Sequence, residues 1–209
     1  RHYRTRVNIN FHCDAADVVG LLCLQKAKSG GKSRIVSSVT VYNELLRQRP
    51  DLVDRLYEPF LMDTKGEGGV RDLPVRPCSF DSGRLRTFYH TDYFRSATDA
   101  QGRTVLTADD RALLDLYNAI AESPGTYLDM DLEPGDVQLL SNHTVMHART
   151  DFEDHAEQAR KRHLLRLWLS LPTGRSLETR LRTEQSRLRM VRATIAVKVR
   201  HALDRVITR

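Results

Sequence analysis

The pattern that most constrains this chain is His12-Cys13-Asp14, at the end of a segment in which polar and apolar residues alternate. Polar side chains occupy every second position from Arg6 to Asp14, and apolar ones occupy the positions between them. A period of two predicts a β-strand with one polar and one apolar face. His12 and Asp14 therefore share a face and can bind one metal ion, while Cys13 points away.

A metal site built on these two residues needs a third ligand from elsewhere in the chain. Two imidazoles and one carboxylate on one side of a metal form the facial triad of non-haem Fe(II) oxygenases, which leaves adjacent positions open. His143 and His147 are the candidates for the second imidazole, and residues four apart share one face of a strand. Spacing alone does not decide between them.

Four motifs follow one another along the chain, and together they resemble a known family. They are His12-x-Asp14, Gly30-Gly31-Lys32-Ser33, Asn142-x4-His147-Ala148-Arg149 and Arg162-x3-Arg166-Leu167-Trp168-Leu169. Over about residues 7–172 the sequence resembles the taurine dioxygenase and 2,4-dichlorophenoxyacetate dioxygenase family, which is related to gamma-butyrobetaine hydroxylase and clavaminate synthase. The resemblance implies a mainly β fold with flanking helices, a double-stranded β-helix or jelly roll. It also implies Fe(II), with 2-oxoglutarate and molecular oxygen as co-substrates.

The resemblance also implies roles for the matched residues. His147, followed by Ala148 and Arg149, matches the distal metal ligand, so His12, Asp14 and His147 are the expected metal triad. The implied reaction is the hydroxylation, or another oxidation, of a small organic molecule, with acidic molecules among the expected substrates.

Three further residues match the family's binding positions for carboxylates. Ser33 and Arg162 correspond to residues that bind the distal carboxylate of 2-oxoglutarate. Arg166 corresponds to a position that contacts an acidic group of the substrate in some relatives. The alternative for Ser33 is a serine that only ends a turn, and for Arg166 it is an ion pair across the sheet.

The last predicted strand, residues 162–171, separates apolar from basic residues. Alternation places four leucines on one face (Leu165, Leu167, Leu169 and Leu171) and Arg162, Leu164, Arg166 and Trp168 on the other. If the leucines pack under a helix, the two arginines point into the barrel. A buried guanidinium is costly unless it meets an anion, and its planar fork suits a carboxylate.

The positive charge of the chain lies at one end. Residues 173–209 carry ten Arg or Lys against three acidic residues, which accounts for the whole formal charge of +6. From Ser176 onward, apolar residues recur on one helical face. We therefore expect a dioxygenase domain over residues 1–172 and a basic amphipathic helical tail over residues 173–209. This helix is expected to pack on its own barrel or to form a homo-oligomer, and binding to nucleic acid is disfavoured.

Local patterns predict most of the other elements. Strands are expected over residues 18–24, 34–37, 127–132 and 136–141, helices over 39–47 and 51–57, and a hairpin over 74–89 around Asp81-Ser82-Gly83. Thr107 and Asp110 predict a capped helix that ends near Ser123. Residues 61–73 contain three glycines and no periodicity, so a mobile loop is expected there.

The chain departs from the family at its start, because only eleven residues precede His12. It is therefore expected to correspond to the C-terminal portion of such an enzyme, with a jelly roll that is incomplete at the N-terminus. Three other classes remain open: a catalytically impaired binding or scaffolding module, a nucleic-acid modifier, and a metal-dependent jelly-roll isomerase or hydrolase.

Composition narrows the setting in which the protein works. No apolar run approaches the ~20 residues that a membrane helix needs, so no membrane partner is expected. The three cysteines, Cys13, Cys23 and Cys78, form no CxxC motif and cannot all pair with one another. This pattern favours a reducing compartment, and a cytoplasmic location is expected.

Overall fold

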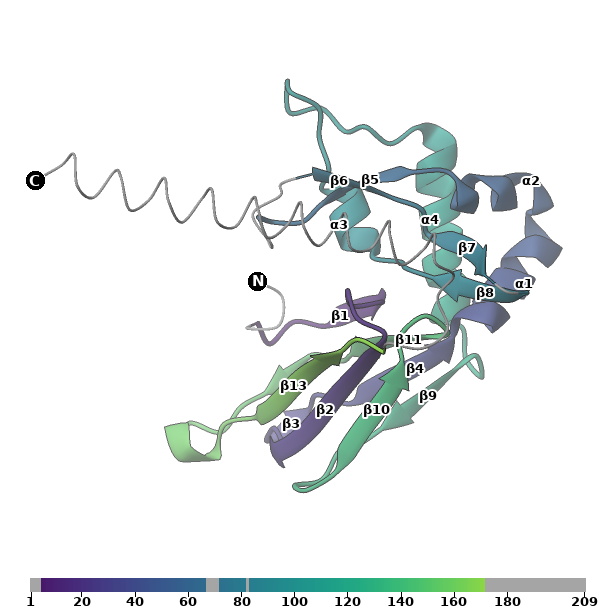
Figure 1. Cartoon of the computed structure of the whole chain (residues 1–209). Coiled ribbons are helices and arrows are strands. Elements are labelled where there is room, and N and C mark those ends of the chain that lie inside the picture. The colour runs from purple at the N-terminus through teal and green to yellow at the C-terminus, as the bar shows by residue number, and fades with distance from the viewer. Residues whose placement is uncertain (1–4, 67–71, 82, 172–209) are drawn as a thin grey trace, which may run out of the picture.

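Two facing β-sheets form the lower half of the protein in Figure 1. The computed structural model describes residues 5–66, 72–81 and 83–171. The first sheet has the strand order β1 (Ile9–His12), β11 (Val145–Arg149), β4 (Ser33–Ser37) and β9 (Tyr127–Met130). The second has the order β10 (Val137–Ser141), β2 (Val18–Gln25) and β13 (His163–Leu169). All neighbouring strands in both sheets are antiparallel.

The chain crosses between the two sheets repeatedly, as in a jelly roll. β1 and β2 follow each other in sequence but belong to different sheets, and so do β9 and β10, and β10 and β11. The expectation of a mainly β fold with flanking helices is confirmed. The described residues supply four strands to one sheet and three to the other, whereas double-sheet jelly rolls have eight strands.

A helical insertion between β4 and β9 packs on the first sheet. It contains α1 (Ser38–Gln48), α2 (Pro50–Val53), the 3-10 helix η2 (Asp54–Tyr57), α3 (Thr91–Arg95) and α4 (Ala108–Ala121). Two hairpins accompany them, β5 (Phe60–Asp63) with β6 (Asp72–Val75), and β7 (Cys78–Asp81) with β8 (Arg84–Thr87). The small elements β3 (Ser29–Gly30), β12 (Phe152–Glu153) and the 3-10 helix η4 (Gln158–Arg160) lie outside this insertion.

The main hydrophobic core lies between this insertion and the first sheet. Tyr89 and Tyr117 stack there with ring centroids 4.2 Å apart, and both are fully buried. Phe11 and Cys13 enter the same core from β1 and the residue that follows it. The predicted alternation is confirmed from Phe11 to Asp14, because Phe11 and Cys13 pack in the core and His12 and Asp14 project to the other side. It does not hold at the start of the segment, where Val7 is 60% exposed and the pairing of β1 with β11 shifts register between Ile9 and His12.

One expectation for local structure is wrong. Residues 61–73 are not one loop, because β5 pairs with β6 from Phe60–Val75 to Asp63–Asp72. Burial of Phe60 and Met62 in the core stabilises this hairpin, whereas periodicity within so short a segment gives no signal. The hairpin around Gly83 is confirmed by the pairing of Cys78–Asp81 with Arg84–Thr87.

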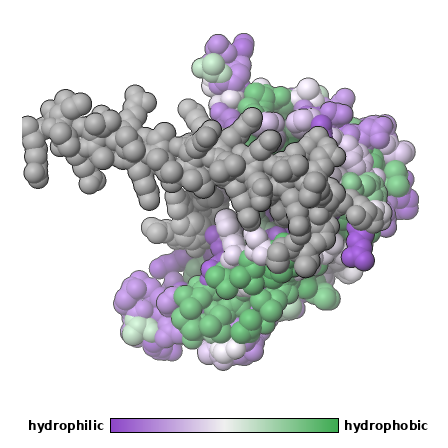
Figure 2. Space-filling view, in the orientation of Figure 1, coloured by the Kyte–Doolittle hydropathy of each residue, from purple (hydrophilic) through white to green (hydrophobic). Residues whose placement is uncertain are grey.

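The leucine face of β13 is not covered by any helix of the described residues. Leu165 and Leu167 are 50% and 59% exposed, and Val137 and Leu139 on β10 are 62% and 65% exposed. The register places both pairs in cross-strand rows through β2, with Gly20 between Leu139 and Leu167. Figure 2 shows the apolar surface over this part of the protein. We call these four residues the outer apolar face.

Other expectations fall on residues or properties that the structure covers only in part. The predicted tail, residues 173–209, lies outside the described residues. Among the described residues, no helix is long and apolar enough to cross a membrane. All three cysteines are free and buried. Burial raises the pKa of the Cys13 and Cys78 thiols to about 12, so both stay protonated at neutral pH.

The capping box of α4 gives a test of the fold. Thr107 Oγ1 accepts from the Asp110 backbone N–H at 3.1 Å, and the Asp110 carboxylate accepts from the Thr107 N–H at 2.9 Å. Thr107→Ala should lower the free energy of unfolding by about 0.5–2 kcal/mol, because an N-terminal donor of α4 loses its partner. Urea denaturation measures this change. The exposed Thr40→Ala in α1 is the matched control, and an equal loss in both variants would contradict the assignment.

Candidate metal centre

The register between β1 and β11 brings two histidines together. His12 is the direct cross-strand partner of His147, and their ring centroids lie 4.3 Å apart. Directly opposed residues on antiparallel strands project on the same side of the sheet. Asp14 follows two residues after His12 and shares its face. Residues more than a hundred positions apart in the sequence thus meet through one strand pair.

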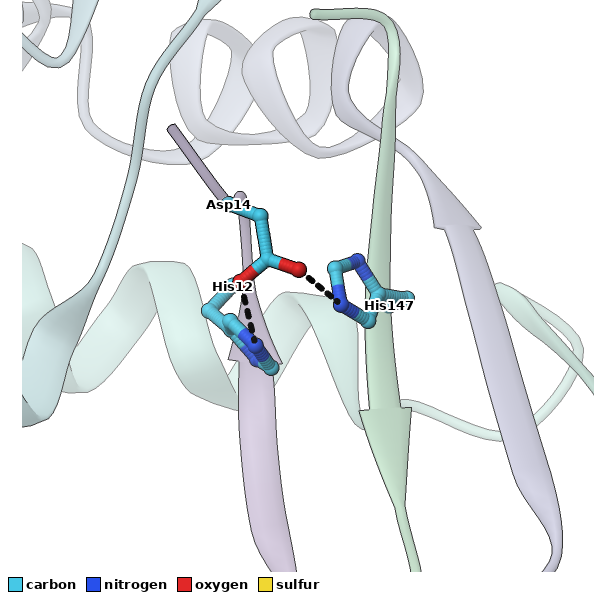
Figure 3. Close-up of side chains that lie close together, drawn as sticks. All are labelled: His12, Asp14 and His147. Atoms are coloured by element: carbon cyan, nitrogen blue, oxygen red, sulfur yellow. Dashed lines mark ion pairs between the residues drawn. The ribbon is translucent and has the colours of Figure 1, made fainter. Parts of the chain in front are cut away.

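The three side chains form one buried cluster, shown in Figure 3. One ligand atom from each of His12, Asp14 and His147 lies within 4.8 Å of the others. His12 Nε2 is 3.8 Å from Asp14 Oδ1, and His147 Nε2 is 3.6 Å from Asp14 Oδ2. In Figure 3 the carboxylate faces both imidazole rings. Two nitrogens and one oxygen at these separations form the donor set of a facial triad.

The two imidazoles are held in the neutral form that metal binding requires. Burial lowers the pKa of His12, and it lowers the pKa of His147 well below its ordinary value, helped by the charges of His12 and Arg166. His12 Nδ1 lies 2.8 Å from the carbonyl oxygen of Asn10. This bond requires the proton on Nδ1, so it leaves Nε2 of His12 available as the ligand atom.

His143, the competing candidate, lies outside the cluster. Its Nε2 is 3.0 Å from Asp17 Oδ1, and Arg86 lies 3.6 Å from the same carboxylate oxygen. The structure therefore brings His147, and not His143, to the other two predicted ligands. The position of His143 at the β10–β11 turn explains the difference, since β11 starts only at Val145.

Asn142 holds the backbone of Asp14 and is fully buried. Its Oδ1 accepts from the Asp14 N–H at 2.9 Å, and its Nδ2 donates to the carbonyl oxygens of Asp14 and Ala16. The sequence motif included Asn142 without giving it a role. Its place in the sequence, five residues before His147, was the only signal for this role. Asn142 lies in the turn between β10 and β11, and this turn lies beside the end of β1.

A cavity of about 530 Å3 opens next to the cluster, between the two sheets. Five of the six predicted site residues line it: His12, His147, Ser33, Arg162 and Arg166. The sixth, Asp14, contacts the two histidines and Arg166. Such a volume is typical of sites for small organic molecules.

Arg162 lies at the wall of this cavity, against the Gly30–Gly31 turn. Gly31 has a positive φ of 72°, and a Cβ there would lie 3.0 Å from Arg162 Nε, so glycine gives the guanidinium its room. Burial lowers the pKa of Arg162. No carboxylate of the described residues is within salt-bridge distance of its guanidinium, which leaves a partly buried cation available to an anion.

Ser33 and Arg166 contact other residues of the site. Ser33 Oγ is buried and donates to Gln138 Oε1 at 2.8 Å. Arg166 Nη1 lies 3.3 and 3.2 Å from the two oxygens of Asp14. An ion pair of Arg166 with an acidic residue was the alternative to a substrate contact, and the structure contains this pair.

Arg149 is a second buried cation that the sequence did not single out as functional. It lines the cavity and donates through Nη2 to the carbonyl oxygens of Thr5 and Val7. Burial lowers the pKa of Arg149 to about 10, and the charge of Arg162 adds to this effect. The positive charges around the cavity favour an anionic ligand.

The competing histidines give a direct test of the cluster. His147→Ala should weaken Mn(II) binding by roughly 100-fold or more, because it removes a ligand and not only an outer partner. His143→Ala should leave the affinity close to that of the wild type, since His143 contacts Asp17. Anaerobic equilibrium dialysis measures both. Loss of Mn(II) in His143→Ala with retention in His147→Ala would reverse the assignment.

Comparisons with known proteins agree with the resemblance noted in the sequence. Over 190 residues the chain is 32% identical to FR-33289 synthase of Streptomyces rubellomurinus, covering 88% of this chain and 56% of that protein. It is 34% identical over 166 residues to the taurine hydroxylase-like protein SAT17 of Stachybotrys chartarum, covering 75% of this chain and 41% of that protein. The chain thus spans about half the length of these curated relatives.

Solved structures show the same fold. A structure of asparagine oxygenase in complex with Fe(II), 3-hydroxyasparagine and succinate superposes with a TM-score of 0.62 at 19% identity, over 79% of this chain and 50% of that one. Residues 1–168 match the family described as taurine catabolism dioxygenase TauD, TfdA family. The chain therefore belongs to the TauD/TfdA family of dioxygenases.

Proposed function

We propose that this chain is the catalytic core of an Fe(II)- and 2-oxoglutarate-dependent dioxygenase that hydroxylates or otherwise oxidises a small organic molecule. The observation that carries the proposal is the cluster of His12, Asp14 and His147 beside a cavity lined by the partly buried cation Arg162. Bound Fe(II) with 2-oxoglutarate supplies oxidation by molecular oxygen, in which one oxygen atom enters the substrate and the other enters succinate, with release of carbon dioxide.

The side chains around the cavity divide the work of binding. His12, Asp14 and His147 would hold the metal on one side and leave its other side to the cavity. Arg162 would bind the distal carboxylate of 2-oxoglutarate, and the Ser33 hydroxyl would turn from Gln138 Oε1 to donate to the same group. Arg166 would contact an acidic group of the substrate. Ser33 is buried, which strengthens its contact because little water competes for it.

The runner-up is a binding or scaffolding module that descends from such an enzyme but does not turn over. The geometry favours the enzyme, because the three ligand side chains and the arginine of the co-substrate position all lie around one cavity. A module without turnover needs no such complete donor set. The distinction is kinetic, so it requires a product measurement.

Succinate formation tests the proposed function. Anaerobically loaded Fe(II) protein, mixed with 2-oxoglutarate and then exposed to oxygen, should release succinate slowly even without a primary substrate. The His147→Ala variant under the same conditions is the control. If the wild type binds metal and 2-oxoglutarate but forms no more succinate than this variant, the binding-module alternative holds.

Arg162 gives a prediction for the co-substrate. Arg162→Ala should raise the Kd for 2-oxoglutarate by roughly 10- to 150-fold, because a hydrogen bond to a charged group contributes about 1.5–3 kcal/mol. Its Mn(II) affinity should stay unchanged, since Arg162 makes no contact with the three ligands. Calorimetry of the Mn(II) protein measures both values. The exposed Arg160→Ala is the matched control, and an equal Kd in Arg162→Ala and wild type would rule out this role.

We also propose that residues 173–209 cover the outer apolar face. The chain leaves β13 at Leu169, beside this face, and these residues follow with leucine, valine and isoleucine on one helical face. Exposed apolar rows of this kind are normally covered by another element. A segment of this length, if helical, reaches ~50 Å, which exceeds the length of β13.

Removal of residues 173–209 tests this cover. The shortened protein should bind more of an apolar dye such as ANS and should self-associate, because Leu139, Leu165 and Leu167 become freely accessible. Light scattering gives the mass in solution. Unchanged dye binding and mass would contradict the proposal, and conversion of a wild-type dimer into a monomer would show that a second copy is the occupant instead.

A further inference from the structure

We propose that Trp168 is a positioning residue that orients the metal ligand Asp14, an inference that rests on the proposed metal site. The indole Nε1–H of Trp168 donates to Asp14 Oδ2 at 2.9 Å. Trp168 contributes no ligand atom and does not line the cavity. Its effect on the metal would therefore act through its hydrogen bond to Asp14.

This hydrogen bond joins the two sheets at the metal centre. His12 and His147 lie on β1 and β11 of the first sheet, and Asp14 lies just beyond the end of β1. Trp168 lies on β13 of the second sheet, two residues after Arg166 and on the same face. The carboxylate that begins on one sheet is thus fixed by a donor from the other.

Asp14 is held at two levels. Asn142 binds its backbone N–H and carbonyl oxygen, which fixes the position of its Cα but not the rotation of its carboxylate. Trp168 binds the carboxylate itself and so limits that rotation. With the indole on Oδ2, the carboxylate would offer the metal one oxygen, in keeping with a triad that leaves positions open for co-substrate.

Arg166 also contacts this carboxylate, but its chemistry differs from that of the indole. Its guanidinium lies 3.3 and 3.2 Å from the two oxygens and 5.0 Å from the Trp168 ring centroid. A positive charge beside Asp14 opposes a second cation at the same oxygens, whereas a neutral N–H donor does not. Trp168 is therefore the donor that can remain on Asp14 when a metal binds, and Arg166 can turn to an anionic group.

The bond also makes the site observable. Trp168 is the only tryptophan among the 209 residues, so all tryptophan emission of the protein comes from beside the metal centre. Mn(II) is paramagnetic and resists oxidation by air better than Fe(II). Mn(II) bound to Asp14 would lie within a few bonds of the indole and should quench its emission.

The first experiment follows tryptophan emission during anaerobic titration with Mn(II). The wild-type emission should fall and reach a plateau at one equivalent. Asp14→Ala keeps Trp168 but lacks the bridging carboxylate, and its emission should not change at the same concentrations. Unchanged wild-type emission, with one Mn(II) bound by equilibrium dialysis, would overturn the proposed contact.

The second experiment removes only the donor. Trp168→Phe keeps an aromatic ring but has no N–H, and its Kd for Mn(II) should rise by about 10- to 100-fold, the range for outer partners of metal ligands. Leu167→Ala, next to it on the opposite face of β13, is the matched control and should keep the wild-type Kd. A Trp168→Phe variant with a lower unfolding midpoint but an unchanged Kd would show that Trp168 serves only packing. Neither readout requires turnover, so failure here is distinguishable from failure of the proposed function.

Discussion

The pairing of β1 with β11 is the constraint on which the rest of the site depends. It sets His12 opposite His147, and a slip of one residue would send one imidazole to the other side of the sheet. The apolar face of β1 prevents this slip, because Phe11 is buried in the core of the helical insertion. The insertion thus contributes to the metal centre without supplying a ligand to it.

The second sheet supplies the side chains that contact the carboxylate of Asp14. β13 carries Arg166 and Trp168 to Asp14, and Arg162 directly precedes this strand at the cavity wall. The ligands therefore come from one sheet and its end, whereas Arg162, Arg166 and the indole donor come from the other sheet or the residue before it. The cavity lies between the metal ligands of the first sheet and the side chains of the second. What it can bind therefore depends on how the two sheets face each other.

The sequence predicted the parts of this arrangement that depend on local patterns. The alternation from Phe11 to Asp14 and the cap at Thr107 both have short-range causes, and both are confirmed. The contact between Trp168 and Asp14 was not predicted, because it depends on the facing of two sheets and leaves no periodic signal. The sequence also left open what covers the β13 leucines, because alternation identifies an apolar face but not the element that covers it.

The central claim is that His12, Asp14 and His147 bind Fe(II) beside a cavity that accepts 2-oxoglutarate. Anaerobic visible spectroscopy tests it most directly, because chelation of Fe(II) by a 2-oxo acid produces a charge-transfer band that neither component shows alone. The band should appear when 2-oxoglutarate is added to the Fe(II) protein and should be missing in Asp14→Ala. A folded protein that binds one Fe(II) but gives no band with saturating 2-oxoglutarate would contradict the account.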